Sequence, residues 1–194
     1  MSTSLFRGEH LALRPPAPAD APALADYLNH PDLIGCRHLP DAFPDDLPLS
    51  AGGIDALIEE WGRAERGLHL LIALHGEAAP IGHAGADWGW DPHAPSLWVV
   101  IAPGWRRRGF GREAAALLLR YLFGCTPAHN VSAWIMSWNS GARAFARSLG
   151  FTENGGPRRL GIRDGAFYDG VIVDLLRPEW LQQQPGGERH TAGR

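Results

Sequence analysis

The segment from Val99 to Ala114, VVIAPGWRRRGFGREA, constrains the fold of this chain more than any other. Its apolar start predicts a buried strand, Pro103 ends that strand, and an Ala/Leu-rich helix is predicted after the glycines. Three consecutive arginines and the pair Gly109 and Gly111 lie between strand and helix. Glycine lets a backbone approach a ligand closely, and a first helical turn offers unpaired N–H groups at the positive end of the helix dipole. Because arginines add bidentate charge at the same place, residues 106–112 are predicted to bind a pyrophosphate.

The rest of the chain predicts one domain of mixed α and β structure. Hydrophobic periodicity predicts strands over 11–14, 68–74, 80–90, 97–101, 130–138 and 166–176, and helices over 20–29, 54–65, the stretch after the glycines, and 140–149. Antiparallel hairpins alternate with crossover helices in this order. We therefore expect the α+β class, with a mixed, mostly antiparallel sheet and helices on both faces. Residues 1–180 are predicted to form the single domain, and the polar segment 181–194 a disordered tail.

Composition excludes several function classes. The chain has 194 residues, a net charge of −3 and no lysine, so Schiff-base lysine chemistry and a Walker-type phosphate lysine are excluded. The charge balance predicts no nucleic-acid partner and no membrane surface. A polar start and the absence of a long apolar run predict a cytoplasmic protein. The two cysteines, Cys36 and Cys125, have no paired spacing and are expected to be buried free thiols; no metal site is predicted.

Three interpretations compete for the arginine and glycine run. It could be a solvated charge cluster before a helix, with the glycines making only a turn. It also fits the dinucleotide pattern G-x-G-x-x-A, but a nicotinamide site needs an acidic residue about 20 positions further on, and residues 131–135 carry no carboxylate. Coenzyme A fits better, because its phosphates suit both the backbone amides and the arginines.

Several short motifs resemble the GNAT superfamily of N-acetyltransferases. Arg106-x-x-Gly109-x-Gly111 resembles the family's R/Q-x-x-G-x-G/A motif. Further similarities lie at Pro80-Ile81-Gly82, at Asn139-x-x-Ala142 with Leu149-Gly150-Phe151, and at 164–169 with Leu175-Leu176 and Glu179-Trp180. The last group resembles the ending of the ribosomal-protein alanine N-acetyltransferases. Together the motifs span residues 11 to 180.

The resemblance implies acetyl-CoA as co-substrate and a set of residues that hold it. The pantetheine arm would pair with the backbone of Val99, Val100 and Ile101, where one N–H would also stabilise the oxyanion. The diphosphate would lie against Arg106, Arg107, Arg108, Gly109, Phe110, Gly111 and Arg112. Asn139 would contact the pantetheine or order a water near the sulfur. Its alternative role is to cap the helix over 140–149.

The general acid and base are less clear from the sequence. Many family members have a tyrosine where this chain has Ala146, so Tyr168 is the candidate acid, with unassisted thiolate departure as the alternative. The family often has a glutamate where this chain has Ser96. Asp87 is therefore the first candidate base, acting directly or through a water, and His83 the second.

The acceptor is expected to be a primary amine. Trp88 and Trp90 are predicted to line its slot, Trp98 to fill the core, and Asp41, Asp45 and Asp46 to attract a cationic amine. The subgroup resemblance favours a protein N-terminal amine. A small-molecule amine such as an antibiotic or polyamine, and a CoA-binding module without catalysis, are the alternatives. A homodimer is compatible with the sequence.

Overall fold

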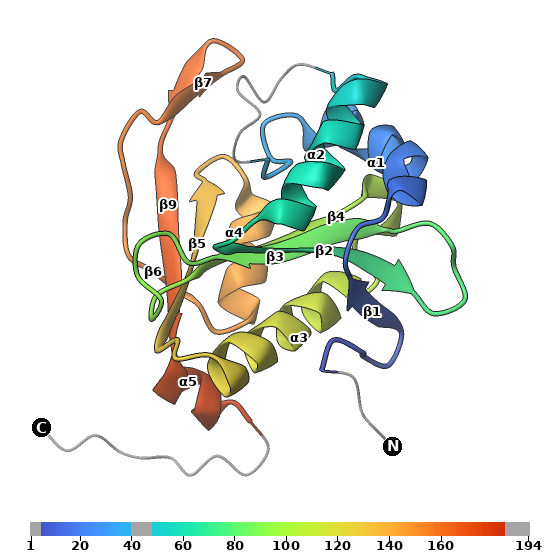
Figure 1. Cartoon of the computed structure of the whole chain (residues 1–194). Helices are drawn as coiled ribbons and strands as arrows, with labels where there is room; N and C mark the ends of the chain where they lie inside the picture. Colours follow the sequence, from blue (N-terminus) through green and yellow to red (C-terminus); the bar gives the residue numbers. More distant parts are fainter. Residues whose placement is uncertain (1–4, 40–47, 185–194) are drawn as a thin grey trace, which may run out of the picture.

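The computed structural model describes residues 5–39 and 48–184. Its strands are β1 (Leu11–Arg14), β2 (Gly67–Leu74), β3 (Gly82–Asp87), β4 (Ser96–Ile101), β5 (Asn130–Met136), β6 (Thr152–Glu153), β7 (Gly161–Arg163), β8 (Ala166–Tyr168) and β9 (Gly170–Leu176). Within the described ranges, a 7-stranded sheet has the order β1-β2-β3-β4-β5-β9-β6, and β7 and β8 form a hairpin that projects beyond it (Figure 1). All neighbours in the sheet are antiparallel except β4 and β5.

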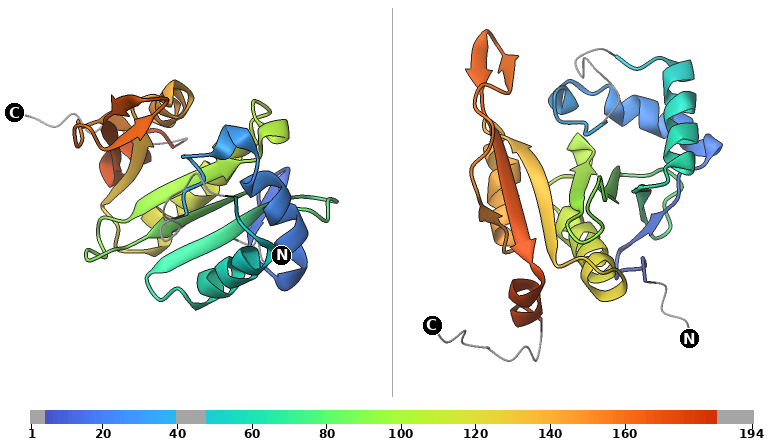
Figure 2. Two further views of the ribbon diagram at one scale, coloured as in Figure 1. Left: turned by 90° about the horizontal axis from the view of Figure 1, so that it is seen from above. Right: turned by 60° about the vertical axis from the view of Figure 1, so that its left-hand side comes forward.

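The helices are α1 (Ala21–Leu28), α2 (Ala51–Arg63), α3 (Phe110–Cys125), α4 (Ser140–Ser148) and α5 (Arg177–Gln182), with short 3-10 turns η1 (Pro18–Asp20), η2 (Pro31–Leu33) and η3 (Pro103–Trp105). Helices α1 and α2 lie on one face of the sheet, and α3 and α4 on the other (Figures 1 and 2). This arrangement confirms the predicted α+β class with helices on both faces.

The side chains of β4 alternate between the two faces because successive residues of a strand point in opposite directions. Leu97 and Val99 pack with the cluster that includes α3 and α4. Trp98 and Val100 pack with the cluster built by α1 and α2. Strand β4 is therefore buried from both sides, and its two sets of side chains face different parts of the molecule.

Strands β4 and β5 separate soon after they meet. Their parallel pairing is a single register position, Ser96 opposite Ser132. On their other edges both strands are fully paired, β4 with β3 and β5 with β9. The two halves of the sheet therefore diverge from Ser96 onward, and the right-hand view of Figure 2 shows the gap between them.

Several sequence predictions differ from the structure at the ends of elements. The strand predicted over 80–90 ends at Asp87, because the Asp87 carboxylate accepts a hydrogen bond from the Gly89 N–H (2.5 Å) and Gly89 turns the chain with φ +47°. The last predicted strand is divided into β8 and β9. Helix α5 includes residues 181 and 182 of the predicted tail, and the residues of the tail beyond 184 lie outside the described ranges.

The structure also bears on the predictions for the two cysteines and for membrane-spanning helices. Neither Cys36 nor Cys125 forms a disulfide bond, but Cys36 is half-buried and Cys125 is exposed at the end of α3, which corrects the expectation that both are buried. None of the helices among the described residues has the length and apolar character needed to cross a bilayer.

Candidate functional site

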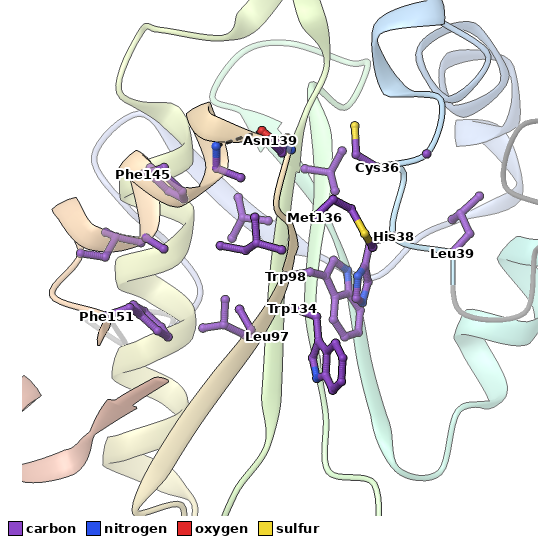
Figure 3. Close-up of a pocket in the computed structure, with 18 residues that line it drawn as sticks. Cys36, His38, Leu39, Leu97, Trp98, Trp134, Met136, Asn139, Phe145 and Phe151 are labelled. Carbon is purple, nitrogen blue, oxygen red and sulfur yellow. Dashed lines mark hydrogen bonds between the residues drawn. The ribbon is translucent and has the colours of Figure 1, made fainter. Parts of the chain in front are cut away.

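A cavity of about 340 Å³ occupies the gap between β4 and β5 (Figure 3). Its two walls are the facing edges of the diverging strands, and segments from both faces of the sheet close it. The lining residues are Gly35, Cys36, His38, Leu39, Leu97, Trp98, Val99, Val100, Ala133, Trp134, Ile135, Met136, Asn139, Ala142, Phe145, Ala146, Leu149 and Phe151. Most of these side chains are apolar, so the cavity suits a long, weakly polar ligand whose amides can pair with a strand edge.

Val99 and Val100 of β4, two of the three residues expected to pair with the pantetheine arm, lie in the cavity wall. Ile101 is not among the lining residues. Its carbonyl accepts a hydrogen bond from Nε of Arg106 (3.0 Å), which fixes the end of β4 to the loop that follows. Because the ladder with β5 stops at Ser96, the β4 backbone beside Val99 and Val100 has no strand partner on the cavity side.

The loop after β4 ends at Gly109, whose left-handed backbone conformation favours glycine. Gly109 is the N-cap of α3 with φ +89°, a conformation that costs a non-glycine residue about 1 kcal/mol or more. Its carbonyl accepts the N–H groups of Arg112 (3.0 Å) and Glu113 (3.2 Å). The N–H groups of Phe110 and Gly111 have no acceptor among the described residues, as expected in a first helical turn. They are available to an anion.

Gly111 connects this helix terminus to the cavity. A Cβ at Gly111 would lie 3.5 Å from Cγ1 of Ile101 and 3.6 Å from Cζ of Phe145, a cavity-lining residue. The absence of a Cβ at Gly111 therefore leaves room for α3 to pack closely against Phe145 of α4. At Gly109 a Cβ would meet open space, so within the fold it is the φ angle that requires glycine, and the close approach of a ligand to its backbone stays a prediction.

Three arginines of the loop, Arg106, Arg107 and Arg108, and Arg112 in the first turn of α3 are exposed on either side of the helix start. Three of them make contacts: Arg106 with the Ile101 carbonyl as described, Arg108 over the Trp105 ring (5.0 Å), and Arg112 with the Ser148 carbonyl (3.1 Å). Arg107 has a left-handed backbone, φ +64°. The positive charge is thus concentrated where the first-turn amides of α3 are unpaired.

Asn139 caps α4 and also lines the cavity. Its side-chain oxygen accepts the N–H of Ala142 (3.0 Å), the geometry of a helix N-cap. Its amide NH₂ donates to no other described residue. Figure 3 places it between Phe145 and Met136. Both roles weighed for Asn139 from the sequence are therefore compatible with its position.

The chain matches the family model described as "Acetyltransferase (GNAT) domain" over residues 10–152. The chain belongs to the GNAT acetyltransferase family. The prophage-derived N-acetyltransferase YokL of Bacillus subtilis is 24% identical over 181 residues, covering 93% of this chain and 97% of that protein. The [ribosomal protein uS5]-alanine N-acetyltransferase of Escherichia coli is 28% identical over 88 residues, 45% of either chain.

A solved structure shares the fold. The GNAT-family acetyltransferase from Bacillus anthracis superposes with a TM-score of 0.75 at 18% identity, covering 89% of this chain and 98% of that one. As a GNAT acetyltransferase the chain is an acetyl-CoA-dependent N-acetyltransferase. The gap between β4 and β5 and the terminus of α3 contain most of the residues that the sequence predicted to hold acetyl-CoA.

The three predicted catalytic residues of this GNAT acetyltransferase lie outside the cavity lining. Asp87 and Ser96 face each other across β3 and β4, at the end where β4 still pairs with β5. The exposed Asp87 carboxylate binds the Gly89 N–H. Tyr168 lies on the projecting hairpin, with its ring edge-on to Trp138 at 6.5 Å. The structure brings Asp87 and Ser96 together but leaves Tyr168 apart from them.

The two tryptophans predicted to line the acceptor slot do not line this cavity. Trp90 is 89% exposed and Trp88 packs against the core on the α3 side, so neither lines the cavity. The reason is the turn at Asp87, which ends the strand alternation that placed them on one face. Trp98 and Trp134 line the cavity instead, and Trp98 is also buried as predicted. The acidic residues 41, 45 and 46 lie outside the described ranges.

His83, the second candidate base, is a structural residue. It is 1% exposed, and its ring nitrogens are engaged with the Tyr27 hydroxyl (3.0 Å) and the Arg37 carbonyl (2.9 Å). Burial lowers the pKa of His83 to about 3, so the imidazole is neutral. The same environment raises the pKa of Tyr27.

A second histidine, His38, was missed from the sequence and lines the cavity. Its ring stacks on Trp98, with centroids 4.4 Å apart and planes inclined at 24°. Burial is the main cause that lowers the pKa of His38 to about 4. No sequence pattern indicates this residue, because it lies in an irregular segment rich in proline and aspartate.

Proposed function

We propose that this GNAT acetyltransferase transfers the acetyl group of acetyl-CoA to the N-terminal amine of a protein. The single observation that carries the proposal is the apolar cavity between β4 and β5, which has an aromatic wall and whose lining residue Phe145 lies beside Gly111 in the first turn of α3. Similarity to the uS5-alanine N-acetyltransferase over 45% of the chain supports the same class of acceptor.

The residues present fit coenzyme A in chemistry and arrangement. The N–H groups of Phe110 and Gly111, with Arg106, Arg107, Arg108 and Arg112 around them, would hold the diphosphate. The free backbone edge at Val99 and Val100 would pair with the amides of the pantetheine arm. Phe145 and Asn139 would flank that arm on the α4 side.

The acceptor side of the cavity favours an amine with one charge. Among the described lining residues on that side, Gly35, Cys36, His38, Leu39, Trp98 and Trp134, none is a carboxylate. A polyamine carries further ammonium groups, and burying them without a carboxylate partner is costly. An α-amine has a pKa of about 7.7–8.0 and is partly neutral at pH 7, so a peptide N-terminus avoids that cost. A small-molecule amine of similar charge is the second candidate.

Catalysis requires a neutral amine, a held thioester and stabilisation of the oxyanion. The cavity positions amine and thioester together, which removes the entropic cost of their encounter. A backbone N–H at the free edge of β4 would donate to the thioester oxygen as it becomes negative.

The test is an acetyl-transfer assay with three acceptor classes. Purified protein is incubated with acetyl-CoA and with N-terminal peptides, polyamines or small aromatic amines, and both thiol release and acetylated product are measured. We expect peptides to be acetylated with the highest kcat/KM. Faster acetylation of polyamines than of peptides would show that the acceptor is a polyamine and not a protein N-terminus. CoA binding without transfer to any amine would support a CoA-binding module without catalysis. The predicted homodimer and cytoplasmic location stay predictions.

A further inference from the structure

His38 is the only imidazole among the residues that line the cavity in the described ranges. It follows η2 and lies on the side of β4 where Trp98 points. Figure 3 shows its ring beside Trp98 and Met136, across the two strands from Phe145. In the proposed function the diphosphate lies on the α3 side of β4 and the acceptor amine lies at the aromatic wall. A group at the position of His38 is therefore on the side of the acceptor amine.

The ring nitrogens of His38 are free to act. Among the described residues, no hydrogen bond reaches either nitrogen, and the side chain is only partly buried. His83, by contrast, uses both nitrogens within the fold. A stacked ring with unpaired nitrogens at a cavity wall is held in orientation by Trp98 while a nitrogen remains open to a ligand.

The backbone of His38 is also unusual. Its φ is +52°, in the left-handed region that few residues other than glycine adopt, although histidine does so more often than most, as asparagine and aspartate do. Such conformations persist only where the surroundings hold them, and they gather at functional sites. The packing of the His38 ring on Trp98 is one contact that holds this backbone conformation.

The charges around His38 keep the imidazole neutral yet able to take a proton. Burial lowers its pKa, and His69 of β2 lowers it further. Asp87 of β3 acts in the opposite direction, and His83 of β3 is also coupled to it. At neutral pH the ring is therefore a free base, and Asp87 is the one described charge that favours its protonated form.

We propose that His38 is the proton acceptor of acetyl transfer, taking the proton that the acceptor amine loses when it attacks the thioester. The inference rests on the proposed function. The amine nitrogen bonds to the acetyl carbon, the carbon–sulfur bond breaks, and its electron pair leaves on the CoA sulfur. The nitrogen of the tetrahedral adduct is much more acidic than the free amine, so a weakly basic imidazole is sufficient. The imidazolium then supplies the thiolate with a proton through water, and the products are the amide and the CoA thiol.

Asp87 then acts through His38 and not on the substrate. Its carboxylate is occupied by the Gly89 N–H outside the cavity lining. Its negative charge favours the imidazolium of His38. Asp87 as the direct base stays the alternative from the sequence, and the Asp87→Asn variant distinguishes the two roles.

Two substitutions at His38 test the proposal without endangering the fold. Glycine and asparagine both tolerate a positive φ, so His38→Gly and His38→Asn retain the backbone. His93→Asn, at an exposed histidine between β3 and β4, is the matched control. Folding is checked by thermal unfolding, CoA binding by calorimetry, and kcat and KM with whichever amine the wild type acetylates best.

We expect both His38 variants to bind CoA within about twofold of wild type and to lose about 100-fold or more in kcat. Added imidazole should restore part of the activity of His38→Gly, because the variant leaves a ring-sized space on Trp98, and should not affect His38→Asn or His93→Asn. Unchanged kcat in His38→Asn, or no rescue of His38→Gly, would overturn the role of His38 alone. A wild type that binds CoA but acetylates no amine would overturn the proposed function and this role with it.

Discussion

The imidazole of His38 stacks on the indole of Trp98 with ring centroids 4.4 Å apart, and the side chain of Trp98 points from β4 away from α3. Its neighbour Val99 points toward α3 and lines the same cavity. The alternation of one strand therefore gives the cavity two chemically different sides. The α3 side offers amides and arginines, and the other side offers an aromatic wall with one imidazole.

Trp134 is predicted to bind the acceptor. It lines the cavity but is 50% exposed, so Trp134→Ala should raise the KM for the acceptor by about tenfold and leave the KM for acetyl-CoA within about twofold. Trp90→Ala is the matched control, since Trp90 is exposed and outside the cavity lining. Equal kinetic effects of the two substitutions would contradict an acceptor wall at Trp134.

Asn139 is predicted to have two separable roles. Asn139→Ala should lose the N-cap of α4 at a cost of about 1 kcal/mol in the free energy of unfolding. Asn139→Asp retains a capping oxygen but lacks the NH₂ donor, so it should unfold like wild type and bind CoA about fivefold more weakly. Urea unfolding and calorimetry measure the two effects. Wild-type CoA affinity in Asn139→Asp would leave capping as its whole role.

Asp87→Asn is predicted to shift the pH dependence of kcat/KM and to change its plateau value only slightly. Asp87 raises the pKa of His38, so its removal lowers that pKa and moves to lower pH the second acid limb of kcat/KM, which lies below the limb set by the acceptor amine. The plateau should remain within about twofold of wild type. A plateau reduced by about 100-fold would instead identify Asp87 as the base itself.

His83 is predicted to make folding sensitive to acid. Its pKa is lowered to about 3 in the fold, while an unfolded histidine has a pKa of about 6.5. Between these pH values the unfolded state binds more protons than the folded state. The contribution of His83 to the free energy of unfolding is therefore greatest above pH 6.5 and decreases as the pH falls toward 3, by at most about 1.4 kcal/mol per pH unit.

Substitution at His83 isolates this effect from the titration of carboxylates. His83→Gln should reduce the slope by about one proton, and it should cost about 1–3 kcal/mol at pH 7 because Tyr27 and the Arg37 carbonyl lose a well-placed partner. His75→Gln, at an exposed ring, is the control. Urea unfolding at several pH values measures both. Parallel curves for wild type and His83→Gln would contradict the assignment.

The sequence predicted those parts of the site that depend on local pattern. The strand over 97–101, the glycine turn and the helix after it follow from periodicity and turn chemistry, and they place Val99 and Val100 at the cavity. The hydrogen bond from the Gly89 N–H to the Asp87 carboxylate is also local, but it ends the strand where the alternation of the sequence predicts that the strand continues. The sequence therefore predicted wrong positions for Trp88 and Trp90.

His38 could not be predicted in this way. Its position depends on stacking with Trp98, which lies 60 positions further along the chain in sequence numbering. The direction of the space at Gly111 likewise depends on Phe145 of α4. Contacts between distant segments leave no periodic mark on either sequence, so only the folded structure reveals them.

The most direct test is calorimetry of CoA binding to wild type, Gly111→Ala and Gly111→Asp. A Cβ at Gly111 meets Ile101 and Phe145 at ordinary contact distances, whereas a carboxylate would enter that packing and repel the diphosphate. We predict that Gly111→Ala binds CoA within about threefold of wild type and that Gly111→Asp binds it at least about tenfold more weakly. No binding heat with wild type, or equal affinity in Gly111→Asp, would contradict a diphosphate site at the first turn of α3.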